Sequence, residues 1–155
     1  MKALTVLLKA TVLVVSVLLV PVSCRVRNLA DVTSNALFSG SFVANVVKEG
    51  SVVVYRRGTT GNYIPGYSKF RIEFVAGSEN RVRFTEYTGE TFDGIWNYSE
   101  DNSTLSFRQL VPVPSAGNSI IFKVEKKERN DFVLSSISPN PKTGSTLNQY
   151  VLISE

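Results

Sequence analysis

The chain has 155 residues, of which 43% are hydrophobic, so it is long enough for one domain and too apolar to be disordered. It contains no histidine and one cysteine, which removes the usual general base and the commonest metal ligand and excludes an intramolecular disulfide. The net charge of +4 includes two lysines near the N-terminus, and without them 15 basic side chains stand against 13 acidic ones. This near balance predicts no nucleic-acid partner, and we also predict no enzyme activity, no metal and no cofactor.

Residues 1–23 have the pattern of a secretory signal peptide. Lys2 and Lys9 supply the positive charge, and residues 10–20 are apolar apart from one Thr and one Ser. A run of this length fits the apolar region of a signal peptide better than a membrane span, which needs about 20 residues. An uncleaved anchor helix is the alternative, because the segment reaches that length from Ala3 if the Lys9 side chain extends to the interface.

The apolar run ends at Ser23-Cys24, and a small residue directly before a lone cysteine resembles the cleavage motif of bacterial lipoproteins. Pro21 stands where that motif usually has Leu. The resemblance implies that Cys24 becomes the first residue and carries the lipid, with residues 24–36 forming the lipidated cysteine and a tether. Arg25 follows, and by the sorting pattern of the lipoproteins that this motif resembles, the absence of Asp at this position implies the outer membrane of a Gram-negative cell envelope. A buried cysteine, or an ordinary secretory cleavage nearby, is the alternative.

From residue 37 onward, short runs of β-branched and aromatic residues alternate with turn clusters, which is typical of an antiparallel sandwich or barrel. We expect the first strands at residues 37–47, 51–57, 67–75, 81–88 and 91–99, with a hairpin turn at 77–80. The first strand is expected to place one set of residues on a common face, namely Phe38, Gly40, Phe42, Ala44 and Val46. The run at 67–75 alternates most cleanly, with Phe70, Ile72 and Phe74 on one face.

The second half of the chain continues the same pattern. We expect further strands at residues 104–110, 120–124, 132–137 and 147–154. Eight or nine antiparallel strands in sequence are what a closed up-and-down barrel requires, and closure removes exposed edges. So many large rings fall on the inferred inner faces that we expect a mostly filled interior. These rings are Phe42, Phe70, Phe74, Phe84, Phe92, Phe107, Phe122 and Phe132.

A family resemblance supports the barrel. Gly94-Ile95-Trp96, the following turn at residues 100–102 and Leu105-Ser106-Phe107 resemble the G-x-W hairpin of lipocalin-like domains in bacterial lipoproteins. Residues 37–42 are similar to the opening L-x-G-x-W strand of those domains, with Phe42 in place of Trp. The resemblance covers most of residues 37–154. It implies a small lipocalin-like β-barrel domain over residues 37–155, and it implies no particular ligand.

The loop at residues 58–66 is the candidate ligand site. It is rich in Gly and long for a hairpin, and long connections are disproportionately functional. Arg56 and Arg57 precede it and suit a carboxylate or phosphate, while Tyr63 and Tyr67 offer flat apolar surface with a polar tip. Strand alternation sends the two arginines to opposite faces, so at most one is expected to bind. A plain connection without a ligand is the alternative.

Two further features have a functional and a structural interpretation. Trp96 is either a ring that stacks on a ligand or, as we expect, a core residue that closes one end of the barrel. Glu86, Glu90 and Asp93 lie around one hairpin, where a pair of carboxylates would suit a glycosidase. Glu86 shares strand parity with apolar neighbours, so we expect it to point inward and to need a cationic partner, for which Arg is the natural candidate.

These observations predict a non-enzymatic lipoprotein anchored in the cell envelope through Cys24. Its lipocalin-like domain is expected either to bind a small apolar or amphipathic molecule, or to act as an interaction or inhibitor module with a filled core and no ligand. The sequence identifies no particular protein partner.

Overall fold

The computed structural model describes residues 38–75, 79–128 and 130–155. Within them the chain forms nine antiparallel strands and two short 3₁₀ helices. In chain order these are β1 (Gly40–Glu49), β2 (Val52–Arg56), η1 (Pro65–Lys69), β3 (Arg71–Val75), β4 (Arg81–Thr85), β5 (Thr91–Ser99), β6 (Thr104–Val111), β7 (Ser119–Lys127), β8 (Asp131–Ser136), η2 (Pro141–Thr143) and β9 (Asn148–Ser154). No helix in this part of the chain is both long enough and apolar enough to cross a membrane.

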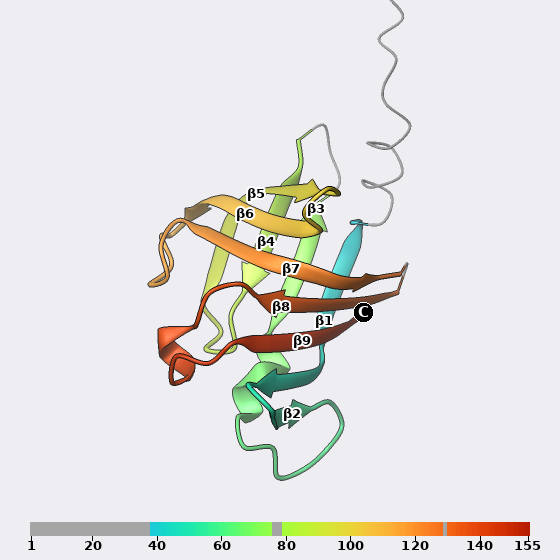
Figure 1. Cartoon of the computed structure of the whole chain (residues 1–155), viewed down its shortest axis with the longest axis vertical. Coiled ribbons are helices and arrows are strands. Elements are labelled where there is room, and N and C mark those ends of the chain that lie inside the picture. The colour runs from blue at the N-terminus through green and yellow to red at the C-terminus, as the bar shows by residue number, and fades with distance from the viewer. Residues whose placement is uncertain (1–37, 76–78, 129) are drawn as a thin grey trace, which may run out of the picture.

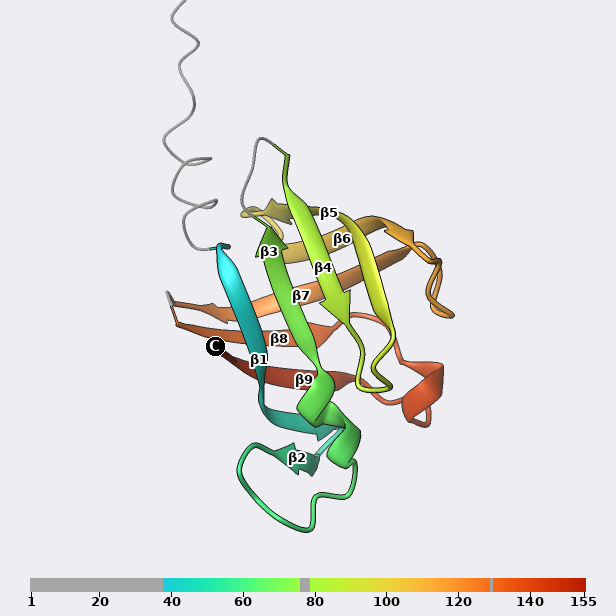
Figure 2. The same ribbon diagram turned by 180° about the vertical axis from the view of Figure 1, so that it is seen from behind.

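Eight of the strands close into a barrel through β1. Along one edge, β1 pairs with β9 from Phe42 to Glu49. Along its other edge, the first part of β1 pairs with β3 and the last part pairs with β2. From β3 to β9 each strand pairs with the next in the chain (Figures 1 and 2). The result is an up-and-down barrel of β1 and β3–β9 with β2 as an extra strand, which confirms the predicted all-β, lipocalin-like fold.

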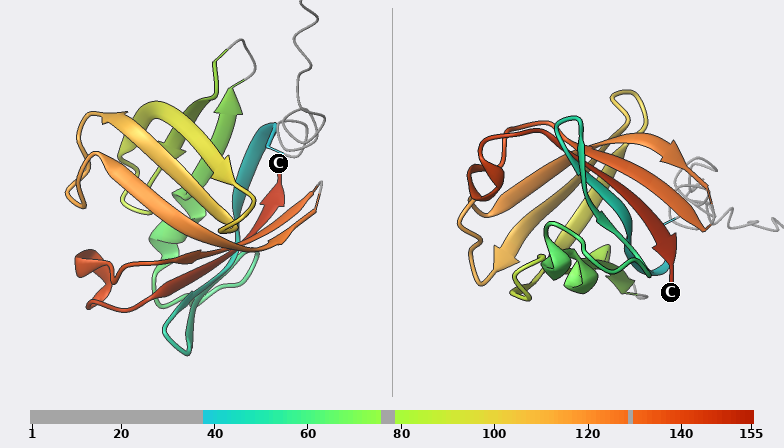
Figure 3. Two further views of the ribbon diagram at one scale, coloured as in Figure 1. Left: turned by 45° about the horizontal axis from the view of Figure 1, so that its top comes forward. Right: turned by 90° about the horizontal axis from the view of Figure 1, so that it is seen from below.

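The interior of the barrel is packed with aromatic rings. All nine Phe side chains are buried, including the eight predicted to face inward. A chain of ring contacts runs through the interior with centroid separations between 5.4 and 6.5 Å. It passes from Trp96 through Phe74, Phe107, Phe122 and Tyr150 to Tyr67. The strands that curl around this column are seen in Figure 3.

Trp96 is a core residue, as predicted. Only 6% of its surface is exposed, and its ring packs against Phe38 and Phe74. Phe38 also stacks on Phe132, so these rings together close the end of the barrel at which β1 begins.

Three local expectations are wrong. The inner face of β1 changes at a bulge between Ala44 and Val46, so that Val47 is fully buried in place of Val46. The expected strand at 67–75 is shorter, because η1 continues to Lys69 after Pro65 and only then does β3 begin. The expected strand at 81–88 ends at Thr85, where the chain turns toward β5. The turn expected at 77–80 falls partly outside the described residues.

Candidate functional site

The loop at residues 58–66 covers the free edge of β2. Asn62 accepts a hydrogen bond from the backbone N–H of Arg56 at 2.8 Å, and its side-chain amide donates to the Arg56 carbonyl at 3.0 Å. Two residues further on, the backbone N–H of Ile64 donates to the carbonyl of Val54. These bonds imitate a neighbouring strand, and an edge covered in this way is closed to pairing with another chain. The loop is therefore held in place along β2.

Three of the four predicted ligand residues are exposed at the end of β2 and in the loop that follows it. Arg56 and Arg57 are exposed, and Tyr63, between the two residues that bond β2, is 81% exposed. Within the described residues neither arginine forms an ion pair. Val52 and Val53 are also exposed on β2, and we call these five residues the β2 surface.

Tyr67, the fourth predicted ligand residue, is separate from the other three. It lies in η1 and is only 1% exposed, with ring contacts to Tyr87 and Tyr150. Its hydroxyl donates to a carboxylate oxygen of Glu49 at 2.8 Å, and burial raises its pKa above the ordinary value. Tyr67 therefore fills the end of the barrel next to η1.

A polar network around Asn148 completes this closed end. The Asn148 side chain is 1% exposed, and its amide donates to the hydroxyls of Tyr67 and Tyr150. Its carbonyl oxygen accepts hydrogen bonds from Thr143 and Thr146. Burial raises the pKa of Tyr150 to about 12, so this phenol stays neutral across the physiological range. Among the described residues, no fully enclosed side-chain oxygen or nitrogen lacks a partner.

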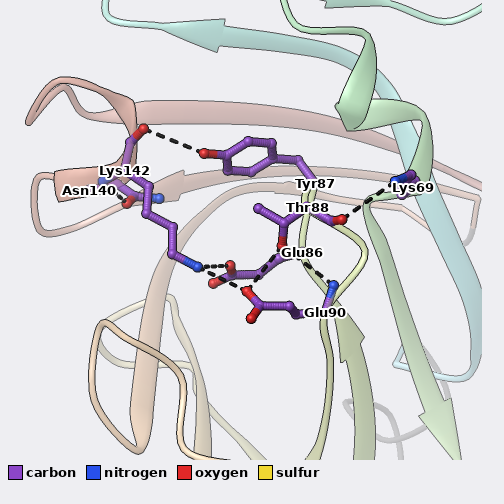
Figure 4. A network of polar contacts seen from close by, with 7 residues as sticks. All are labelled: Lys69, Glu86, Tyr87, Thr88, Glu90, Asn140 and Lys142. Carbon is purple, nitrogen blue, oxygen red and sulfur yellow. Dashed lines mark hydrogen bonds and ion pairs between the residues drawn. The ribbon is translucent and has the colours of Figure 1, made fainter.

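Lys142 ties the connection between β8 and β9 to the turn after β4 (Figure 4). Its ammonium group lies 2.6 Å from a carboxylate oxygen of Glu86 and 3.2 Å from one of Glu90. Glu86 is buried, as predicted, and its cationic partner is this lysine where an arginine was expected. The hydrogen bond to Glu86 raises the pKa of Lys142, and the hydrogen bond from Lys142 lowers the pKa of Glu90.

Each of the three carboxylates that could supply the acid–base pair of a glycosidase has a cationic partner. Glu86 and Glu90 share Lys142, and Asp93 pairs with Arg83 at 2.9 Å on the outer surface of the barrel. In the part of the chain that the structure describes, no three acidic or cysteine side chains gather as a metal site. The shared Lys142 holds two loops together.

A pocket that the sequence did not predict lies where β5 crosses between β4 and β6. It has a volume of about 630 Å³ and opens to solvent. Its lining residues are Glu79, Asn80, Ile95, Trp96, Asn97, Arg108 and Gln109. The G-x-W motif places two of these residues on β5, but the motif gave no sign of the residues that β6 contributes.

No protein-family model matches this sequence, and no match was found among curated proteins. The chain is similar in structure to an uncharacterized protein from Bacteroides eggerthii DSM 20697, with 14% identity and a TM-score of 0.46 over 76% of this chain and 99% of that one. It is also similar to a lipocalin-like protein from Bacteroides uniformis ATCC 8492, with 14% identity and a TM-score of 0.45 over 77% of this chain and 99% of that one. The predicted lipidation site, Cys24, lies outside the described residues.

Proposed function

We propose that this protein is a non-enzymatic interaction module of the cell envelope, anchored by lipid at Cys24 and binding a partner through the β2 surface. One observation carries the proposal: aromatic rings occupy the barrel from Trp96 at one end to Tyr67 at the other. An eight-stranded barrel is just wide enough to be filled by side chains or to hold one small ligand. Here the side chains occupy that space, which favours function on the outside.

The rival proposal is a small apolar or amphipathic ligand inside the barrel. Such a ligand would have to displace rings such as Phe107, which is fully buried, or Tyr67, which is hydrogen-bonded to Glu49. Displacing a buried, hydrogen-bonded phenol leaves a carboxylate without its donor, and an unmade buried hydrogen bond costs about 1–3 kcal/mol. The filled-core module is therefore the better supported of the two.

The β2 surface has the composition of a protein-binding surface. Arg and Tyr are the residue types that most often dominate interface energetics, and here Arg56, Arg57 and Tyr63 are exposed in β2 and its loop, as are Val52 and Val53. Asn62 fixes the loop with three hydrogen bonds, so little conformational freedom is lost when a partner binds. Two arginines without ion pairs in the described structure favour a partner that carries carboxylate or phosphate groups.

The position of this surface fits a lipid anchor at the N-terminus. β1 begins at one end of the barrel and reaches β2 only with its last residues, at the other end (Figure 1). A chain tethered through residues 24–36 would therefore present the β2 surface away from the membrane. We propose the outer membrane as its location, on the motif at Ser23-Cys24 and the Arg that follows it.

The anchor is tested by Cys24→Ala. This variant is expected to leave the membrane fraction or to accumulate as the uncleaved precursor, because no thiol remains to carry lipid. Cell fractionation and the mass of the purified protein measure both outcomes. A variant of mature size that stays in the membrane fraction would show that Cys24 is not the anchor.

The filled core is tested by native mass spectrometry of the protein extracted from its own membranes. We expect the mass of the lipidated chain alone. A retained small molecule in stoichiometric amount would favour the ligand-binding rival.

The β2 surface is tested by a photo-crosslinking amino acid placed at position 63 in cells. We expect a discrete cross-linked product that weakens when Arg56 and Arg57 are both replaced by Gln. The matched control carries the same amino acid at Val113, which is also well exposed but lies in the β6–β7 loop. Equal products from both positions, or none from position 63, would remove this surface from the proposal.

A further inference from the structure

The pocket between β4, β5 and β6 is shaped by an irregularity of β6. Asp93 pairs with Val111 while Ile95 pairs with Arg108, so two residues of β6 stand opposite the single Gly94. Such bulges commonly re-aim a side chain near a functional site. Here Arg108 and Gln109 are consecutive and both exposed, and both line the pocket.

The backbone of this bulge is strained and supported from β5. Gln109 has a φ of 54°, a left-handed conformation that side-chain-bearing residues rarely adopt. A Cβ atom on Gly94 would lie 2.6 Å from the Arg108 carbonyl oxygen, so only Gly permits this close approach. Strain of this kind persists where the surrounding structure enforces it, and it gathers at binding sites.

Most polar side chains of the pocket have no partner among the described residues, the exception being Glu79, which pairs with Arg81 at 3.6 Å. Within the described residues, the side chains of Asn80, Asn97, Arg108 and Gln109 make no hydrogen bond or ion pair. The indole N–H of Trp96 also has no acceptor among the described residues, although only 6% of the Trp96 surface is exposed. Every fully enclosed side-chain nitrogen or oxygen in those residues has a partner, so an N–H without one cannot be fully enclosed. This N–H therefore reaches the surface, and Trp96 is a lining residue of the pocket. A buried Trp usually finds a partner for its N–H, whereas that of Trp96 has none among the described residues.

We propose that this pocket binds a saccharide. Three side-chain amides, a guanidinium and a carboxylate line the pocket beside the apolar side chain of Ile95, and Trp96 is a further lining residue. Each sugar hydroxyl both donates and accepts, which matches amides that do the same, while the C–H face of a sugar ring suits Ile95. The volume of about 630 Å³ lies within the usual range for small-molecule sites of roughly 300–1,000 Å³.

Two other ligand classes fit these groups less well. An anion would meet one unpaired cation, Arg108, with the carboxylate of Glu79 in the same pocket. A peptide in extended form would need a row of free backbone groups, whereas the unpartnered atoms identified here belong to side chains.

The single tryptophan of the chain makes the test direct, because its fluorescence and its one indole N–H signal in NMR spectra report only on position 96. The probes are maltose, lactose and N,N′-diacetylchitobiose, with diglycine and sodium acetate as the peptide and anion probes. We expect a saturable shift of the indole signal with at least one disaccharide and none with diglycine or acetate. No shift with any of the three disaccharides, or a shift with diglycine or acetate alone, would overturn the proposal.

Matched variants locate the site. Gln109→Gly removes the amide and keeps the left-handed backbone, and Asn97→Ala removes a second amide from β5. Each is expected to weaken disaccharide binding roughly five- to tenfold, as the loss of one hydrogen bond predicts. Asn118→Ala, an exposed amide outside the pocket, is expected to bind as the wild type does. Equal affinity in all three variants would place binding elsewhere and contradict the proposal.

Discussion

Two polar regions of this barrel differ in how their hydrogen-bonding groups are used. At the end closed by η1 and η2, Tyr67, Asn148 and Lys142 bond to one another or to nearby carboxylates and hydroxyls. In the pocket of β5 and β6, side chains such as Asn97 and Gln109 have no partner within the described structure. Polar groups that satisfy each other stabilise a fold, whereas groups left unpaired at a concave surface are free to bind something else.

Tyr67 and Trp96 are both buried aromatic residues with a polar atom, but they differ in whether that atom has a partner. Tyr67 donates its O–H to Glu49, so its polar atom belongs to the core. Trp96 packs its ring just as tightly, yet its N–H has no acceptor in the described residues. Burial alone therefore does not distinguish these two residues, and the state of the polar atom does.

The largest effect is expected from Tyr67→Ala at the closed end. Removing a fully packed ring should lower the free energy of unfolding by about 3–5 kcal/mol. The matched control is Tyr63→Ala in the preceding loop, where an 81% exposed ring should change stability by less than about 0.5 kcal/mol. Urea denaturation measures both. Similar losses in the two variants would mean that Tyr67 does not fill the barrel end.

A smaller effect is expected from Lys142→Met, which leaves Glu86 buried without its cation. We expect a loss of about 1.5–3 kcal/mol near neutral pH, as for hydrogen bonds to charged groups. Lys123→Met, an exposed lysine bonded to one backbone carbonyl, should lose less than about 0.5 kcal/mol. A loss as small as that of the control would mean that Lys142 does not tie the two loops together.

The effect of Lys142→Met should depend on pH in a defined direction. Lys142 lowers the pKa of Glu90 below its usual 4.5, so this pair stabilises the fold above that pH. The contribution is lost as the pH falls through the lowered pKa of Glu90. The stability difference between wild type and variant should therefore narrow in acid, and denaturation series at about pH 7 and pH 3 would measure it. A difference that widens in acid would contradict the pairing.

The smallest stability effect is expected from Gln109→Gly in the pocket. Glycine adopts the left-handed backbone freely but loses more chain entropy on folding, and the two effects roughly cancel. The free energy of unfolding should change by less than about 0.5 kcal/mol, measured in the same urea series. A large loss would show that the Gln109 side chain supports the fold, which would remove the contrast with the closed end.

The strands and their inner faces were predictable, because a strand alternates with a period of two and residues such as Phe70, Ile72 and Phe74 repeat it. The bulges were not predictable, because one extra residue at Asn45 or Gln109 reverses the alternation of inward and outward side chains without any change in composition. Glu86, the residue after β4, continues the same alternation and is buried.

The candidate site was predictable only in part. Arg56, Arg57 and Tyr63 are exposed at the end of β2 and in its loop, whereas Tyr67 joins the core because Pro65 starts a 3₁₀ helix. The partner of Glu86 lies 56 residues away, and contacts of this kind arise only when the barrel closes. The pocket depends on the same closure and on the bulge in β6.

The filled interior is tested most directly by measuring whether the protein binds benzene and palmitate. Phe107→Ala removes a ring that contacts Phe74, Phe84 and Phe122 at the centre of the barrel, and an apolar cavity of that kind binds benzene. Benzene should raise the melting temperature of this variant and leave that of the wild type unchanged, and the wild type should not bind palmitate. Saturable binding of palmitate or benzene by the wild type would show that the interior holds a ligand and would contradict the filled-core proposal.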